Sequence, residues 1–297
     1  MKYIFLLLVL FTYSAESSAL FDKQKPTLSD LIDNSLVIAI GAVDRIDDDL
    51  GSIKVKTVLR GAVKPGDVLT FNRKQDWTDT RPWDVLNDQP AARFHALLFA
   101  RSTDHGRLRL ADWGILWVED DDVAETGAAI GEAIALKAGN PSTEARLNSL
   151  VRAFGQPSLR PAASRELLWK GRFRGIAHHA RQKLPLSAAQ MERLIEAFIA
   201  RPSVGYGLTV VISYAENIPN QKLDAVIVRA FESTLACNER WHLAQSAELV
   251  IARFGGRPSP ASFRRAGTDF VSSEWAKVRR QAGYSEANEL LPCPMFK

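Results

Sequence analysis

The spacing of apolar residues changes along the chain, from alternation in the first part to a repeat of three or four positions in the second. Residues 35–43 form an apolar run typical of a buried strand, and residues 53–59 alternate as a half-buried strand does. Residues 94–100 and 113–118 predict further strands. Because short strands alternate with turns, such as the one containing Pro and Gly at 64–67, the pattern favours a small β-barrel or β-sandwich.

The second part predicts amphipathic helices joined by short connections that contain Pro or Gly. Ser187 and Gln190 have the spacing of an N-cap residue and its capping-box partner. Residues 208–214 are apolar on nearly every side, which indicates a buried helix. Residues 243–254 form another helical stripe, which ends at the Gly-Gly pair 255–256. Connections this short predict antiparallel helix pairs.

Composition divides the chain near residue 141. Residues 20–141 carry 15 basic and 20 acidic side chains, whereas residues 142–297 carry 22 basic and 13 acidic ones. The segment 137–142 combines Gly, Asn and Pro, which commonly interrupt regular structure. We therefore expect an α+β chain: a β domain at 20–141, followed at 142–297 by an all-α domain, either a helical repeat or a helical bundle.

Three features follow one another in the first part: an apolar strand, the turn VLRGAVKPGD at 58–67 and the strand ALLFA at 96–100. Together, over residues 35–118, they resemble the netrin-like barrel, an OB-type fold that also occurs in tissue inhibitors of metalloproteinases. The resemblance implies a small barrel. Those inhibitors place an N-terminal cysteine on the metal of the protease, whereas the first cysteine of this chain is Cys237. Inhibition by that mechanism is therefore not implied.

Similar segments recur in the helical part. LIEAFIARPS at 194–203 and VIVRAFESTL at 226–235 lie 32 positions apart, and LVRAFGQPSLRP is echoed by LVIARFGGRPSP about 100 positions later. On this basis residues 143–283 resemble HEAT-like helical repeats, in which each helix pair covers the face of the next. The spacing is irregular, and a plain helical bundle fits it equally well.

The N-terminus predicts export. Lys2 precedes an apolar run at 3–11, and Ser17-Ser18-Ala19 fits a small-x-small cleavage site, so residues 1–19 are interpreted as a signal peptide. A membrane anchor is the alternative, but nine apolar residues are too few to cross about 30 Å of hydrocarbon. We expect a periplasmic or secreted protein that begins at Leu20 and has no transmembrane segment.

The chain has two cysteines, Cys237 and Cys293. In an exported protein such a pair favours one disulfide, which would hold the C-terminal tail against the last helices. The alternatives are two free thiols, with Cys237 buried, or a link between two chains.

No motif for catalysis, cofactor binding or metal binding stands out. His178 and His179 are adjacent, so on a helix they point about 100° apart and do not share a metal ion. The acidic runs 47–49 and 120–122 lack the spacing of a calcium loop, and solvated turns explain them better. We expect no cofactor and no metal.

Two groups of residues are candidates for binding. Arg165, Arg172, Arg174 and Arg181 crowd around one predicted helix, together with Arg160 and several lysines, and could hold an acidic partner. The alternative is a solvated helix face that balances the acidic β half. The second group is the pair Trp77 and Trp83 in a polar insertion, which either makes contacts or covers the end of the barrel.

These features favour an exported, non-enzymatic protein that binds a macromolecular partner through its basic helical domain. An immunity-type or scaffold protein is the more specific form of this hypothesis. The expected partner is a protein of the cell envelope, with an anionic glycan or lipid as alternatives, whereas nucleic acid is not expected outside the cytoplasm. The hypothesis from another class is an envelope hydrolase with an unrecognised active site.

Overall fold

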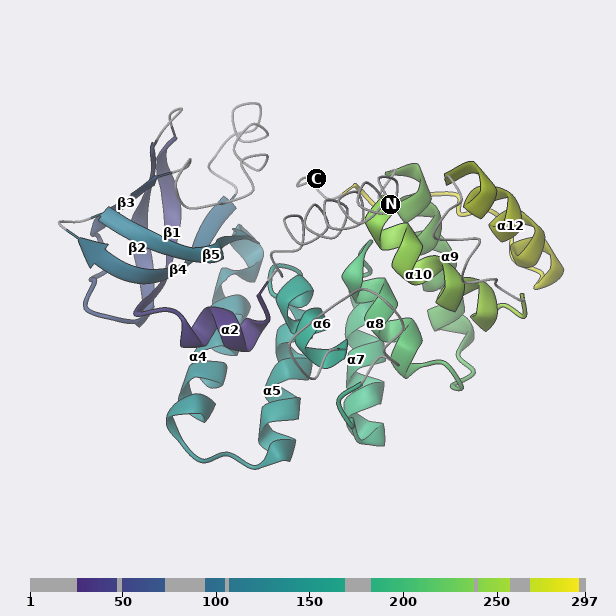
Figure 1. The fold of residues 1–297 in the computed structure, drawn as a ribbon, viewed down its shortest axis with the longest axis horizontal. Helices are drawn as coiled ribbons and strands as arrows, with labels where there is room; N and C mark the ends of the chain where they lie inside the picture. The colour runs from purple at the N-terminus through teal and green to yellow at the C-terminus, as the bar shows by residue number, and fades with distance from the viewer. Residues whose placement is uncertain are drawn as a thin grey trace, which may run out of the picture.

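A computed structural model provides the structure of the chain, and it has a β-barrel followed by a helical region, as an α+β chain should (Figure 1). The residues that the structure describes are 26–46, 50–72, 94–104, 107–168, 183–237, 240–256 and 268–293. The predicted signal peptide lies outside these ranges and stays a prediction. Among the helices of the described residues, none combines the length and the apolar character needed to cross a bilayer.

The barrel is closed by five strands. Their order around the barrel is β1-β2-β3-β5-β4, and β4 pairs back to β1. All neighbours are antiparallel except β3 and β5, which are parallel. The strands are β1 (Val37–Ile46), β2 (Leu50–Arg60), β3 (Val68–Asn72), β4 (Phe94–Asp104) and β5 (Arg107–Glu119). Of the two predicted forms, barrel and sandwich, the barrel is thus confirmed.

The predicted turn between β2 and β3 is also present. Gly66 has a φ of +95°, a conformation that side chains with a Cβ rarely adopt. The main-chain N–H of Lys64 donates to the carboxylate of Asp67 at 2.7 Å, which closes the turn. This turn brings β3 back alongside β2, so that Lys54 lies opposite Val68.

Alternate residues of the strands enter two different cores. Residues such as Ile53, Val55 and Leu98 fill the interior of the barrel. Leu97 and Phe99, which alternate with them on β4, point outward and join the core of the helical region. Because β4 is buried on both faces, its sequence is a nearly continuous apolar run instead of a strict alternation.

The helical region consists of two rows. The helices α5, α7 and α9 contact one another in succession, as do α6, α8 and α10, and each of the pairs α5–α6, α7–α8 and α9–α10 is in contact. The helices are α2 (Leu28–Asp33), α4 (Val123–Ala138), α5 (Thr143–Gly155), α6 (Arg160–Leu168), α7 (Ala188–Ala200), α8 (Tyr206–Tyr214), α9 (Gln221–Ala236), α10 (Arg240–Arg253) and α12 (Thr268–Gln281), with a short 3₁₀ helix, η2 (Asp120–Asp122), before α4.

Several local predictions for the helices are confirmed. Ser187 caps α7 in a full capping box, because its hydroxyl accepts the N–H of Gln190 while the Gln190 side chain accepts the N–H of Ser187. Every residue of α8 from Gly207 onward is buried, as its all-round apolar sequence predicts. Gly255, just after α10, has a φ of +83°.

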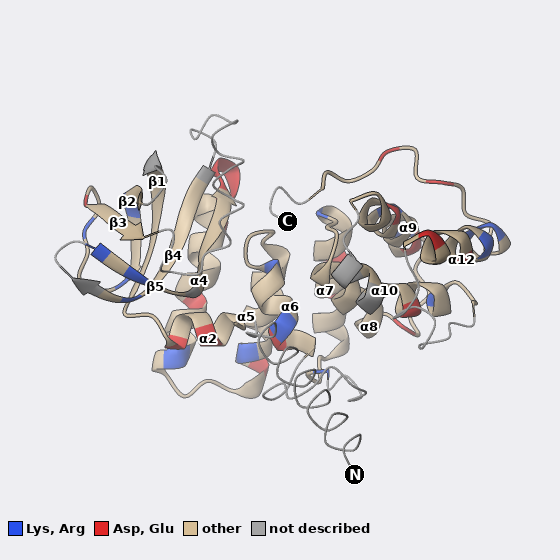
Figure 2. Ribbon diagram, turned by 45° about the horizontal axis from the view of Figure 1, so that its top comes forward, with Lys and Arg blue, Asp and Glu red and all other residues tan. Residues whose placement is uncertain are grey.

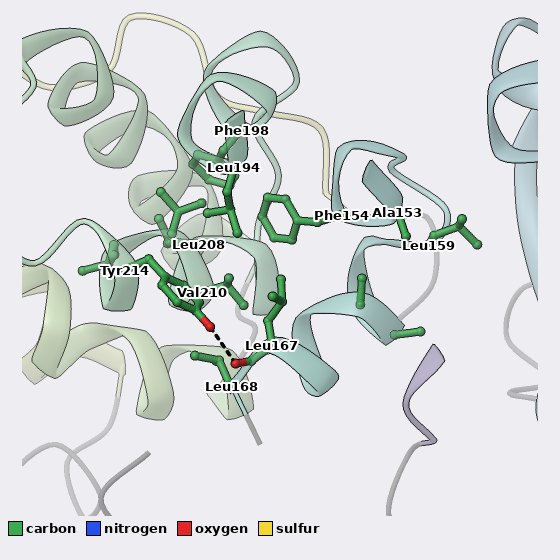
Figure 3. Packing of buried hydrophobic residues seen from close by; sticks show 14 of the residues in the cluster. Ala153, Phe154, Leu159, Leu167, Leu168, Leu194, Phe198, Leu208, Val210 and Tyr214 are labelled. Carbon is green, nitrogen blue, oxygen red and sulfur yellow. Dashed lines mark hydrogen bonds between the residues drawn. The ribbon is translucent and has the colours of Figure 1, made fainter. Parts of the chain in front are cut away.

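Apolar packing joins the two rows of helices. Phe154, Leu194, Phe198 and Leu208 meet between α5, α7 and α8 (Figure 3). Tyr214, at the end of α8, donates from its hydroxyl to the carbonyl of Leu167 at 2.9 Å and lies as close to that of Leu184. Burial raises the pKa of this hydroxyl, which keeps it a neutral donor.

The barrel and the helical region share one core. Helix α2 contacts both β5 and α6, and Ser29 donates its N–H and its hydroxyl to the carboxylate of Glu166 at 2.9 and 2.5 Å. Helix α4 contacts β2, β5 and α5. The predicted boundary at 141/142 falls in the connection between α4 and α5, and the division into two domains stays a prediction.

The disulfide is present. Cys237, directly after α9, is bonded to Cys293 near the C-terminus, with 5.5 Å between their Cα atoms. The tail is thereby held against the last helices, as expected for an intramolecular bridge.

Candidate binding surface

One predicted binding residue within the described ranges, Arg165, is not on the surface. Only 6% of it is exposed; its Nε donates to the carbonyl of Pro26 at 2.7 Å, and its guanidinium lies 5.8 Å from the ring centre of Tyr206. We expected a surface cation here, and the structure corrects this: Arg165 ties the segment before α2 to α6. Burial lowers its pKa to about 10, so it stays charged at neutral pH. Arg172, Arg174, Arg181, Trp77 and Trp83 lie outside the described residues.

Arg160 has a similar internal role, although its sequence neighbours suggested a surface cation. It is 2% exposed, and its guanidinium donates to main-chain carbonyls near the ends of two helices. Nε bonds the carbonyl of Phe154 on α5 at 2.8 Å, and the Nη atoms bond those of Ala197 on α7 and Arg201 after it. The C-terminal ends of helices carry partial negative charge, so they stabilise a buried cation without a carboxylate. The absence of a side chain at Gly207 leaves room for Arg160, since a Cβ there would lie 2.7 Å from the Arg160 Cδ.

Most other described cations of the helical region are also bonded within the chain. Ion pairs join Arg152 to Glu132, Lys183 to Glu216, Arg201 to Asp122, Arg229 to Glu289, Arg253 to Asp224, Lys277 to Glu274, and Arg279 to Glu232. The described part of this region therefore offers few free cations to a partner, despite its positive charge.

The barrel presents the opposite situation. Lys54 and Lys56 on β2, and Arg107 and Arg109 on β5, are exposed, and none of the four forms an ion pair with a described carboxylate. We call these four residues the basic strand surface. Figure 2 shows basic positions on both strands. They point outward because the residues between them, Val55 on β2 and Leu108 on β5, fill the barrel interior.

Strand β3 lies between the two pairs of cations. Lys54 on β2 is opposite Val68 of β3, and Arg107 on β5 is opposite Thr70 of β3. Two of the four cations therefore lie on each side of β3. Val68 is 50% exposed and adds an apolar contact between them. A basic surface with an exposed apolar residue at its centre suits an acidic partner.

His95 lies on β4, close enough to Lys56 for the charge of that lysine to act on it. It is 3% exposed, and its Nδ1 is 2.9 Å from a carboxylate oxygen of Asp120, although without hydrogen-bond geometry. Burial lowers the pKa of His95, the charge of Lys56 lowers it further, and the charge of Asp120 opposes both. The imidazole is therefore neutral at neutral pH, and it adds no charge to the basic strand surface.

The remaining chemistry is sparse. Among the described residues, no three His, Cys, Asp or Glu side chains gather where they could hold a metal ion. Comparison of the chain with protein-family models, curated proteins and solved structures finds no match.

The sequence analysis did not identify the basic strand surface, although the sequence carries a signal for it. Lys54 and Lys56 occupy alternate positions of one strand, as Arg107 and Arg109 do of another, and alternate residues of a strand share one face.

Proposed function

We propose that this chain is an exported, non-enzymatic protein that binds an acidic protein of the cell envelope on its basic strand surface. The observation that carries the proposal is the contrast in pairing: the four cations of β2 and β5 are exposed and have no described carboxylate partner, whereas most described cations of the helical region are bonded internally. Exposed cations attract an acidic partner and speed its association.

The architecture supports this role. OB-type barrels, which residues 35–118 resemble, commonly bind ligands on the face of the second and third strands, and β2 and β3 carry Lys54 and Val68 here. The two rows of helices fit the HEAT-like interpretation, and they would hold the barrel on a rigid support. An immunity-type or scaffold protein is the more specific form of the proposal.

The test is crosslinked capture from the cell envelope, read by mass spectrometry. The mature chain is compared with the double variant Lys54→Gln/Arg107→Gln and with a matched control, Arg146→Gln/Lys222→Gln, which removes two exposed helical cations. We expect the mature chain and the control to capture the same acidic protein, and the barrel variant to capture about tenfold less, since two charge interactions are lost. Raising the salt concentration should weaken capture similarly.

Equal capture by the three proteins would refute the role of the basic strand surface. Capture of anionic glycan in place of a protein would replace the proposed partner class. Export is tested separately, by N-terminal sequencing of the mature protein, which should begin at Leu20.

A further inference from the structure

The last described residues, 284–293, form a segment without helix or strand, which we call the C-terminal strap. It runs along α9, and side chains of α9 bond its main chain. The N–H of Ala287 donates to the carboxylate of Glu232 at 2.6 Å, and that of Leu291 donates to the hydroxyl of Ser233 at 2.8 Å. Nε of Arg229 donates to the carbonyl of Glu289 at 2.9 Å.

Two buried ion pairs lie beneath the C-terminal strap. Arg253 and Asp224 are 2.6 Å apart, and Arg279 and Glu232 are 3.0 Å apart, with each arginine side chain less than one tenth exposed. Both acids also contact the strap, because Asp224 accepts the hydroxyl of Tyr284 at 3.4 Å and Glu232 accepts the N–H of Ala287. The strap therefore completes the burial of these charges, and a buried pair is sensitive to the loss of a partner.

The polar contacts alone hold the strap weakly. An open groove of about 300 Å³ lies between part of the strap and α9, where Ala225, Val228 and Arg229 line it, so the packing there is looser than in a protein interior. Most strap residues are exposed, and exposed ion pairs contribute little stability. The covalent link between Cys237 and Cys293 is the strongest attachment.

The two cysteines differ in access. Cys237 is 2% exposed at the end of α9, whereas Cys293 lies at the exposed end of the strap. A dithiol that reaches the bridge would attack Sγ of Cys293, because Sγ of Cys237 is covered. The attack forms a mixed disulfide and releases the Cys237 thiolate; the second thiol of the reagent then displaces Cys293, so that two electrons pass to the protein and the dithiol becomes a disulfide.

We propose that the C-terminal strap is a thiol–disulfide latch, closed by oxidation over the two buried ion pairs and opened by reduction. Opening is confined to the strap. The opposite side of α9 packs Leu223, Ile227 and Phe231 into the main core, to which the strap adds the partly buried side chains of Tyr284 and Leu291. Closure after export rests on the proposed export of the chain, since disulfides form in oxidising compartments.

Amide hydrogen exchange of the full mature chain tests the latch. In the oxidised protein the N–H groups of Ala287 and Leu291 should exchange slowly, because both are bonded. After addition of a dithiol reductant, we expect their exchange to rise by about a hundredfold or more, while amides of the barrel and of α5 to α8 keep their protection. The variant Cys237→Ser/Cys293→Ser should behave like the reduced protein without any reductant.

Glu289→Gln is the matched control, since it removes the ion pair with Arg229 and leaves the bridge intact; its strap should stay protected. Unchanged exchange at Ala287 and Leu291 on reduction would overturn the latch. Loss of protection over the whole chain would overturn it as well, because the bridge would then hold the entire fold. Neither result depends on export, which is read separately from the thiol state of chains retained inside the cell and chains recovered outside.

Discussion

The barrel and the helical region use basic residues in different ways. Arg160 and Arg253, in the helical region, donate to main-chain carbonyls at helix ends, whereas Lys54 and Arg107, on strands, are exposed. The difference follows from the backbone. A helix leaves its last four carbonyls without partners, and these carbonyls attract cations, whereas strand carbonyls within a closed barrel bond the neighbouring strand.

Arg60 shows that proximity to a helix end decides the outcome, rather than membership of a region. It is the last residue of β2, yet its guanidinium donates to the carbonyls of Ile32 and Ser35 at the end of α2. A strand cation is therefore also used internally when a helix ends beside it. The net charge of a segment says little about which of its cations are free.

The largest effect is expected at Arg160. Replacement by Met should lower the free energy of unfolding by about 3 kcal/mol or more, because the carbonyls of Phe154, Ala197 and Arg201 lose their hydrogen bonds from the guanidinium, and the bond to Phe154 is buried. Denaturant unfolding measures the change. The control Arg146→Met, at an exposed helical position, should change the free energy of unfolding by less than about 0.5 kcal/mol. Equal effects would abolish the distinction between internal and surface cations.

A smaller loss is expected at Arg165. Arg165→Met should destabilise the chain by about 1–3 kcal/mol, since the carbonyl of Pro26 loses this partly buried hydrogen bond. Hydrogen exchange should rise in α2 before it rises in the barrel, because Arg165 holds the segment that leads into this helix. If α2 stays protected from hydrogen exchange in the variant, the hydrogen bonds from Ser29 to Glu166 are sufficient to hold this helix in place.

The third effect depends on pH. The pKa of His95 is lowered in the folded protein from its ordinary value of 6.5, so the unfolded chain binds the proton more strongly. Stability should therefore fall as pH decreases below 6.5, and the loss should end below the folded pKa. The difference between the chain and His95→Asn isolates this contribution. A rise in stability on acidification would mean that pairing with Asp120 outweighs burial.

The smallest effect on stability is expected on the barrel. Lys54→Gln/Arg107→Gln should leave the free energy of unfolding within about 0.5 kcal/mol of its original value, because neither side chain has a described ion-pair partner. Thermal unfolding measures this, and the result also shows that any loss of binding comes from charge and not from misfolding. A large destabilisation would mean that Lys54 and Arg107 stabilise the fold, as Arg160 does.

Local sequence patterns determined much of the fold. Alternation over 53–59 predicted a strand, and Ser187 with Gln190 predicted the start of α7, because strand period and helix capping depend on residues a few positions apart. The apolar sequence of 208–214 predicted a buried helix, and the cysteine pair predicted the bridge between α9 and the tail. Each of these patterns lies within the segment whose structure it predicts, except for the cysteines, where two residues allow only one disulfide within the chain.

Only the tertiary structure decided which cations are free. Arg160 and Arg165 looked like surface residues because a basic helix is commonly solvated, but their partners are carbonyls of Ala197 and Pro26, far away in the sequence. The closure of the barrel likewise set Lys54 and Arg107 on either side of β3. A cation is bonded or free according to the helix ends and carboxylates that reach it, and long-range packing brings these groups together.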